Sequence, residues 1–245
     1  MRCPWASLLL LKLTKNAIFY IIFSILTVIA KKISIIMQNT LFTIGHSTQS
    51  VEKFIELLNR HQINCVVDVR SVPYSQYASQ FNEREIKFAL KNKGIRYIYM
   101  GKEFGARRNN KDLYDEDNRL NFSRTMKSEE FLTGVDRIKR GMEKGYRIVF
   151  MCSEKDPLFC HRCILIGKAF YGYGYPVENI LEDGTTISQD QVGALLVDEC
   201  FPERNQITLL EWAKSEENSE EDYIEKAYHM REKEIAYVLG EDGGE

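Results

Sequence analysis

Short apolar segments alternate with segments of helical periodicity along the chain from residue 41 onward. This alternation restricts the fold more than any other feature of the sequence. The apolar segments are short and β-branched, and we predict strands at 41–44, 65–69, 95–100, 147–151 and 177–181. Strands that alternate with helices form parallel βαβ units. The sequence therefore predicts an α/β fold, with a layered parallel sheet of about five strands and helices on both faces.

Capping residues indicate where the intervening helices begin. Ser50 and Ser128 each precede a run with apolar residues on one helical face, which is where a serine N-cap stands. Asn82 and Glu85 have the spacing of a capping box. The segment 101–127 is polar and too long for an ordinary connection, so we expect a lid or an insertion there.

The two ends of the chain differ from the predicted domain. Residues 17–30 form an uncharged apolar run flanked by lysines, shorter than the roughly 20 residues that a spanning helix needs. Three interpretations stay open for the extension 1–36: a short membrane anchor, an uncleaved signal, or a segment upstream of a true start at Met37. We therefore divide the chain into this extension, a domain at 37–200 and an acidic, solvated helical tail at 201–245.

The charge balance and the cysteine content narrow the class of protein. The 33 basic and 35 acidic residues give a net charge of -2, which argues against nucleic-acid binding through bulk charge but leaves a local basic patch open. The six cysteines are interpreted as free thiols, because a chain of 245 residues needs no disulfides to be stable. Free thiols predict a cytoplasmic location, or a membrane-anchored one if residues 17–30 are retained.

Polar side chains follow several predicted strands at their carboxyl ends, where open parallel sheets bind ligands. The candidate catalytic residues are Cys152, Cys160, His161, His46, Asp68 and Glu154. The candidate ligand-binding residues are Arg70, Arg162, Ser47 and Arg107. Because the carboxyl ends of parallel strands meet at one edge of a sheet, we expect these side chains to lie close together. The pattern assigns them neither a metal nor a particular cofactor.

Each of these groups also has a purely structural interpretation. His46 could form a hydrogen bond across its Gly-His-Ser turn, and Asp68 and Arg70 could form an ion pair that ties one strand to its neighbours. The cysteines near residue 160 could pack a loop, with Arg162 paired to Glu154 or Asp68.

The stretch MCSEKDPLFCHRC at 151–163 supports three sharper hypotheses. A thiolate at Cys152, after a strand and with Arg162 at a helix start, resembles the layout of rhodanese-like and cysteine-phosphatase sites. A zinc site is a second hypothesis, although the ligand spacing matches no standard finger; its ligands would be Cys152, Cys160, His161 and Cys163. Third, Cys160 and Cys163 have the C-x-x-C spacing of a redox pair.

Several motifs occur in a fixed order along the chain. They are Thr43-Ile44-Gly45-His46-Ser47, Val67-Asp68-Val69-Arg70 with Pro73 and Ser75, Gly94-Ile95 with Tyr97, and Cys152, Glu154 and Cys160-His161-Arg162. Together they resemble the bacterial family called domain of unknown function 488, over about 41–184. The resemblance implies an α/β domain with these residues gathered at one site, and it implies no particular reaction.

Two functions from different classes fit this pattern. The first is an enzyme acting on an anionic small molecule or a nucleotide, with Cys152 or Cys160 as the nucleophile and His46 or His161 moving the proton. The second is a module that binds a phosphate, a nucleotide or a nucleic acid without catalysis, through arginines and stacking tyrosines. The tyrosines considered for stacking are Tyr74, Tyr77, Tyr97 and Tyr99. The oligomeric state does not follow from the sequence.

Overall fold

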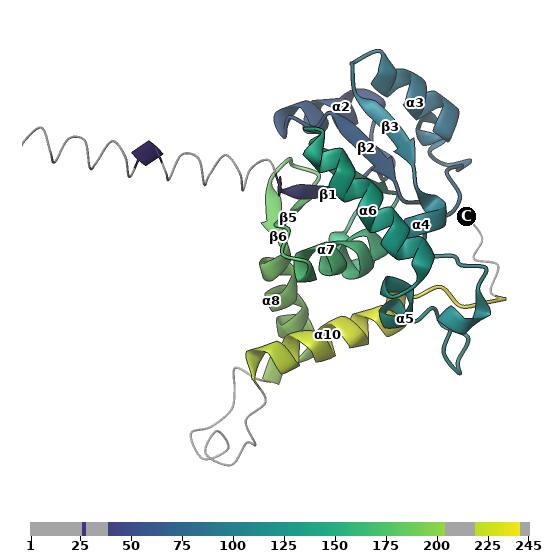
Figure 1. Ribbon diagram of the computed structural model, residues 1–245, viewed down its shortest axis with the longest axis vertical. Coiled ribbons are helices and arrows are strands. Elements are labelled where there is room, and N and C mark those ends of the chain that lie inside the picture. The colour runs from purple at the N-terminus through teal and green to yellow at the C-terminus, as the bar shows by residue number, and fades with distance from the viewer. Residues whose placement is uncertain (1–25, 28–38, 204–218, 241–245) are drawn as a thin grey trace, which may run out of the picture. The chain divides into compact units, whose positions relative to one another are not determined.

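A six-stranded sheet forms the centre of the fold, with the strand order β3-β2-β4-β1-β5-β6 (Figure 1). The strands are β1 (Leu41–Gly45), β2 (Cys65–Asp68), β3 (Arg96–Tyr99), β4 (Ile148–Cys152), β5 (Val177–Ile180) and β6 (Thr186–Ser188). The first five are parallel, and β6 pairs with β5 in the antiparallel direction. The predicted α/β fold is confirmed. The added edge strand was not predicted, because three residues are too few to show an alternating pattern.

The structure is a computed structural model that describes residues 26–27, 39–203 and 219–240. Nearly all of the extension 1–36 therefore lies outside the described residues, including the predicted anchor or signal, as does the middle of the predicted tail. The described residues from Thr40 onward belong to one unit of the chain. Within the described ranges, no helix combines the length and the apolar character needed to cross a membrane.

Helices cover both faces of the sheet, as predicted (Figure 1). The helices α2 (Val51–Arg60) and α3 (Glu83–Lys91) pack on one face, around a cluster that includes Ile44 and Met151. The helix α6 (Glu129–Glu143) packs on the other face, with the turns η4 (Arg162–Gly167) and α7 (Lys168–Gly172). Successive strand residues point to opposite faces, so Cys152 faces the α6 side together with Phe150.

Two of the three predicted caps form as expected. The hydroxyl of Ser50 accepts a hydrogen bond from the N–H of Lys53, and the hydroxyl of Ser128 accepts one from Phe131. The predicted capping box at Asn82 is wrong, because the side-chain oxygen of Asn82 accepts instead from the N–H of Ser75. Asn82 and Glu85 have the spacing of a capping box, but the tertiary structure places the N–H of Ser75 against the Asn82 side chain instead.

The predicted insertion at 101–127 contains three short helical turns, namely α4 (Gly101–Phe104), η2 (Lys111–Leu113) and α5 (Phe122–Met126). It is tied to the end of the described chain. The N–H of Leu120 donates to the carbonyl of Tyr237, and the N–H of Leu239 donates to that of Asn118. The insertion and the C-terminal segment therefore support each other.

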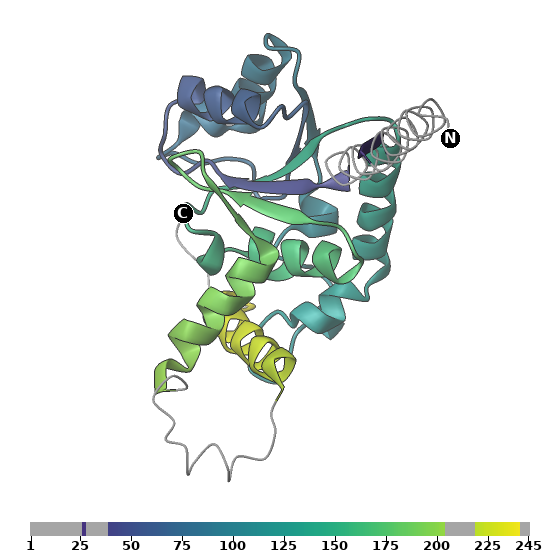
Figure 2. The same ribbon diagram turned by 90° about the vertical axis from the view of Figure 1, so that its left-hand side faces the viewer.

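The C-terminal helix α10 (Glu220–Ile235) packs against α8 (Gln189–Cys200), and Figure 2 shows the two helices side by side below the sheet. It was expected to be a solvated helix. Instead it buries Ala227 and Tyr228 in the same cluster as the α6 face of the sheet. The acidic composition suggested solvent exposure, but apolar residues on one face decide where the helix lies.

Candidate functional site

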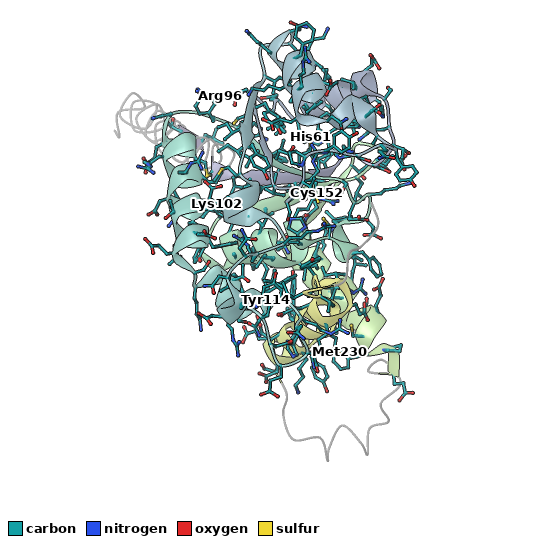
Figure 3. All side chains as sticks on the ribbon, turned by 90° about the vertical axis from the view of Figure 1, so that its right-hand side faces the viewer. His61, Arg96, Lys102, Tyr114, Cys152 and Met230 are labelled. Atoms are coloured by element: carbon teal, nitrogen blue, oxygen red, sulfur yellow. The ribbon has the colours of Figure 1, made fainter. Side chains whose placement is uncertain are left out.

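Two cysteine sulfurs and one imidazole meet at the carboxyl end of β4. The Sγ atom of Cys152 lies 3.8 Å from Nδ1 of His161, and the Sγ atom of Cys160 lies 3.9 Å from the same nitrogen. Figure 3 labels Cys152, which lies in the interior of the molecule and is 4% exposed. The fold therefore brings together three of the predicted catalytic residues.

The ring of His161 is held by the backbone of the neighbouring strand end. Its Nε2 atom lies 3.2 Å from the carbonyl oxygen of Val69, directly after β2. A carbonyl oxygen only accepts, so Nε2 carries a proton and Nδ1 faces the sulfurs. A neutral His161 accepts there from a thiol, and a protonated His161 donates there to a thiolate.

Arg162 is fully buried beside this group, at 0% exposure. Its guanidinium donates to the backbone carbonyls of Glu154 (2.5 Å) and Lys155 (3.1 Å), so it holds the loop that follows β4. The structural alternative paired Arg162 with Glu154 or Asp68, whereas these two hydrogen bonds of its guanidinium go to backbone carbonyl oxygens. Gly45 makes room for this loop, since a Cβ there would stand 1.8 Å from the Glu154 carbonyl oxygen.

The surroundings shift the pKa values of the two thiols in opposite directions. A hydrogen bond from Cys160, together with the charges of His161 and Arg162, lowers the pKa of Cys152 well below its ordinary value despite burial. Burial, and then the neighbouring Cys152, raise the pKa of Cys160 well above its ordinary value. These opposite shifts favour Cys152 over Cys160 as the thiol that loses its proton.

A second buried cluster surrounds Arg70 on the α2 and α3 side. The guanidinium of Arg70 forms two hydrogen bonds with the carboxylate of Asp68, at 2.9 and 2.6 Å, and donates to the carbonyl of Phe81 at 2.8 Å. The hydroxyl of Tyr97 donates to the same carboxylate at 2.7 Å. The ion pair that we considered as a structural alternative therefore exists, and it fixes the direction of Arg70.

His46 belongs to this second cluster. Its Nδ1 atom lies 2.8 Å from the carbonyl oxygen of Ser47, and its Nε2 atom lies 3.1 Å from the guanidinium of Arg70. The first contact requires a proton on Nδ1 and the second a lone pair on Nε2, so His46 is neutral. Burial, reinforced by the charge of Arg70, lowers the pKa of His46 from 6.5 to about 4.

The two clusters meet at a cavity of about 390 Å³. Its lining includes the two arginines Arg70 and Arg107 together with Cys152, Cys160 and His161. The remaining lining residues are Ser71, Val72, Ala106, Ser153, Glu154, Phe159, Ile235 and Tyr237. A cavity with two arginines and an acidic thiol offers an anionic ligand both a binding charge and a nucleophile.

Some predicted site residues lie behind the cavity wall. His46 and Asp68 are buried and act on the cavity through Arg70. Ser47 has a left-handed φ of 46° and donates its N–H to the carbonyl of Ser153, so it joins the β1 turn to the loop after β4. Glu154 is exposed at the cavity edge.

The contacts of Cys163 differ from those that both the zinc hypothesis and the C-x-x-C hypothesis require. Its sulfur lies 3.7 Å from the side-chain oxygen of Gln189, and burial raises its pKa to about 12. The ligand atoms of Cys152, Cys160 and His161 all lie within 4.8 Å of one another, so these three residues could hold a metal ion without Cys163.

Part of the site was not foreseen from the sequence. Ile235 and Tyr237, from the C-terminal segment, line the cavity, and the guanidinium of Arg107 lies over the ring of Tyr237 at 5.2 Å. Tyr97 was considered only for stacking, yet it supports Asp68. The only feature of the sequence that could have pointed to Tyr237 was its position as an aromatic residue after an acidic helix. The other stacking candidates, Tyr74, Tyr77 and Tyr99, are not among the residues that line the cavity.

The fold and the site define a class: an α/β protein with a thiol, imidazole and arginine site at the carboxyl edge of a parallel sheet. The family model described as "Domain of unknown function DUF488" matches residues 50–168. The α/β domain of this chain therefore belongs to the DUF488 family. The match includes Asp68, Arg70, Cys152 and the Cys160-His161-Arg162 motif. No curated protein and no solved structure matches the chain significantly.

Proposed function

We propose that the protein is a cysteine-dependent enzyme that acts on an anionic small molecule or a nucleotide, with Cys152 as the nucleophile. One observation carries the proposal: the sulfur of Cys152 stands beside Cys160 and His161 in the wall of a cavity that Arg70 and Arg107 also line. A thiolate next to arginines is the arrangement that activates a cysteine and attracts an anion.

The neighbours of Cys152 divide the remaining tasks. His161, whose Nδ1 faces both sulfurs, is the group that moves protons at the site. His46, named earlier as the other candidate for this task, has both ring nitrogens engaged and orients Arg70 instead. Arg162 stabilises the thiolate from behind, and the arginines of the cavity hold the negative charge of the ligand.

The binding of a phosphate, a nucleotide or a nucleic acid without catalysis is the second candidate. Arg107 favours it, because its guanidinium lies over Tyr237 at the cavity and is partly exposed. Binding of this kind weakens steeply with salt and tolerates Cys152→Ser. A cytoplasmic location, which suits the five free cysteines of the described residues, and the bacterial origin implied by the resemblance are further parts of the proposal.

The test is the rate at which iodoacetamide alkylates each cysteine of the native protein between about pH 5 and about pH 9, relative to the ordinary thiol pKa of about 8.5. We expect Cys152 to react fastest below neutral pH. Cys65 and Cys163 provide internal controls, because burial raises their pKa values to about 11 and about 12. Equally slow reaction at all three positions would remove the nucleophile from the proposal and leave the binding module.

A second measurement separates catalysis from binding. Cys152→Ser should abolish turnover of a substrate while it leaves the binding of inorganic phosphate unchanged. Cys163→Ser is the matched control, because it changes a buried thiol close in sequence that contacts Gln189. Full activity of Cys152→Ser would contradict the proposal.

A further inference from the structure

The sulfurs of Cys152 and Cys160 are neighbours in space, although the residues are separated by a loop. Both contact the same nitrogen of His161, and the three atoms lie within 4.8 Å of one another. A disulfide requires a sulfur–sulfur distance of about 2.05 Å and a Cβ–Cβ distance near 3.8 Å. Because the two sulfurs are already neighbours, we expect rotation of the two side chains to bring them toward that geometry.

The loop between the two cysteines is suited to a small adjustment. It contains the single turn η3 (Pro157–Phe159), and Lys155 and Asp156 within it are exposed. The N–H of Cys160 donates to the carbonyl of Pro157 at 3.3 Å, a long hydrogen bond. After His161 the chain continues as the π-helical turn η4, a geometry that is frequent at functional sites.

Charge balance favours a dithiol here over a divalent metal. Arg162 is buried in the cluster, and the neighbours that raise its pKa against burial are the sulfurs of Cys160, Cys152 and Cys163. One thiolate neutralises one guanidinium. A divalent cation with two thiolates beside Arg162 would leave a buried net positive charge, which is costly.

We propose that Cys152 and Cys160 form a reversible disulfide couple that reduces a hydroperoxide, with Cys152 as the attacking thiol and Cys160 as the resolving thiol. This inference rests on the proposed function, because it requires Cys152 to be the nucleophile, and it names the class of substrate. The carboxylate or phosphate of an anionic organic hydroperoxide would lie against Arg70 and Arg107.

The steps balance as a two-electron oxidation of the protein. The Cys152 thiolate attacks the terminal oxygen of the hydroperoxide, the O–O bond breaks, and the alkoxide takes a proton from solvent water and leaves as an alcohol. This forms a sulfenic acid on Cys152. The sulfur of Cys160 then attacks that of Cys152, the S–O bond breaks, and hydroxide takes the Cys160 proton and leaves as water. An external dithiol reductant returns both residues to the starting state.

The test uses the full chain, reduced and analysed for metal, with hydrogen peroxide at one equivalent as the probe. Peptide mapping by mass spectrometry without reduction should show a 152–160 disulfide, reversed by a dithiol. In Cys160→Ser, the sulfenic acid on Cys152 should persist and be trapped by dimedone at a level about tenfold above that of the wild type. Cys163→Ser, the matched control, should form the disulfide normally.

Three results would overturn the inference. One is rapid alkylation of Cys152 at low pH without any 152–160 disulfide, in which case the proposed function stands. Another is a disulfide between Cys160 and Cys163. The third is one equivalent of tightly bound metal that is lost in both Cys152→Ser and Cys160→Ser. Circular dichroism of each variant, and Cys160→Ala as a second replacement, separate these results from a failure to fold.

Discussion

At the scale of single residues, Arg70 shows how a structural ion pair also serves the site. Asp68 holds its guanidinium with two hydrogen bonds, His46 accepts a third, and the side chain still lines the cavity. The contacts that make Asp68 and Arg70 a structural ion pair are therefore the same contacts that orient Arg70 toward the cavity. A guanidinium that must face a ligand in one orientation needs hydrogen-bond partners that hold it there.

Asp68→Asn should destabilise the protein strongly, because it leaves the buried Arg70 without a counter-charge. We expect a loss of about 3 to 5 kcal/mol in the free energy of unfolding, measured by urea denaturation. The control is Tyr97→Phe, which removes one hydrogen bond to the same carboxylate and should cost about 1 kcal/mol. Equal effects of the two variants would show that the ion pair is not what Asp68 contributes.

The lowered pKa of His46 predicts that the stability of the protein depends on pH. Its folded-state pKa lies near 4, below the ordinary 6.5, because of burial and then Arg70. The unfolded chain therefore binds the proton first, so stability is full above about pH 6.5 and falls as the pH drops toward about 4, by roughly 3 kcal/mol in total. His46→Gln should lose this part of the dependence in urea titrations at each pH. A wild-type profile that is flat over this range would contradict the neutral assignment of His46.

At the scale of elements, the C-terminal helix holds the loop that carries Cys160. From α10, Arg231 donates to the carbonyl of Leu158 at 3.3 Å, and its guanidinium lies 3.8 Å from the ring centre of Phe159. Phe159 itself lines the cavity. An element that the sequence suggested to be peripheral therefore positions part of the site.

Arg231→Met should loosen the turn η3 while keeping an apolar stem in place. The backbone amides of Phe159 and Cys160 should exchange with deuterium about tenfold faster, because local opening becomes easier. Lys233→Met, an exposed change in the same helix, is the control and should leave exchange unaltered. Unchanged exchange in Arg231→Met would mean that η3 is held by other contacts.

At the scale of the whole molecule, the cavity joins segments from both ends of the described domain. Arg70 follows β2, Arg107 belongs to the insertion, and Ile235 and Tyr237 come from the C-terminal segment. A ligand that bridges these segments binds only the folded state. Ligand binding should therefore stabilise the entire fold.

Inorganic phosphate should raise the melting temperature of the protein, and sodium chloride should reduce this effect by screening the arginines. Arg107→Gln should lose at least about half of the phosphate-dependent increase. Arg84→Gln is the control, because Arg84 is an exposed arginine on α3 and does not line the cavity. An equal loss in both variants would indicate unspecific binding of phosphate to surface charge.

The sequence by itself determined the elements and the edge at which the site lies. Short apolar runs and helical periodicity are local patterns, so the strands, the Ser50 and Ser128 caps and the placement of His46, Arg70 and Cys152 at strand ends could be predicted. In an open parallel sheet, these positions necessarily gather at one edge.

Only the tertiary structure decided which of these residues touch. The insertion of β4 between β2 and β1 places Cys152 beside the ends of both neighbours, and nothing local specifies that strand order. Packing paired Cys160 with Cys152 rather than Cys163, and it docked α10 so that Tyr237 reaches the cavity. These contacts join residues far apart in sequence, and their geometry depends on how the whole core packs.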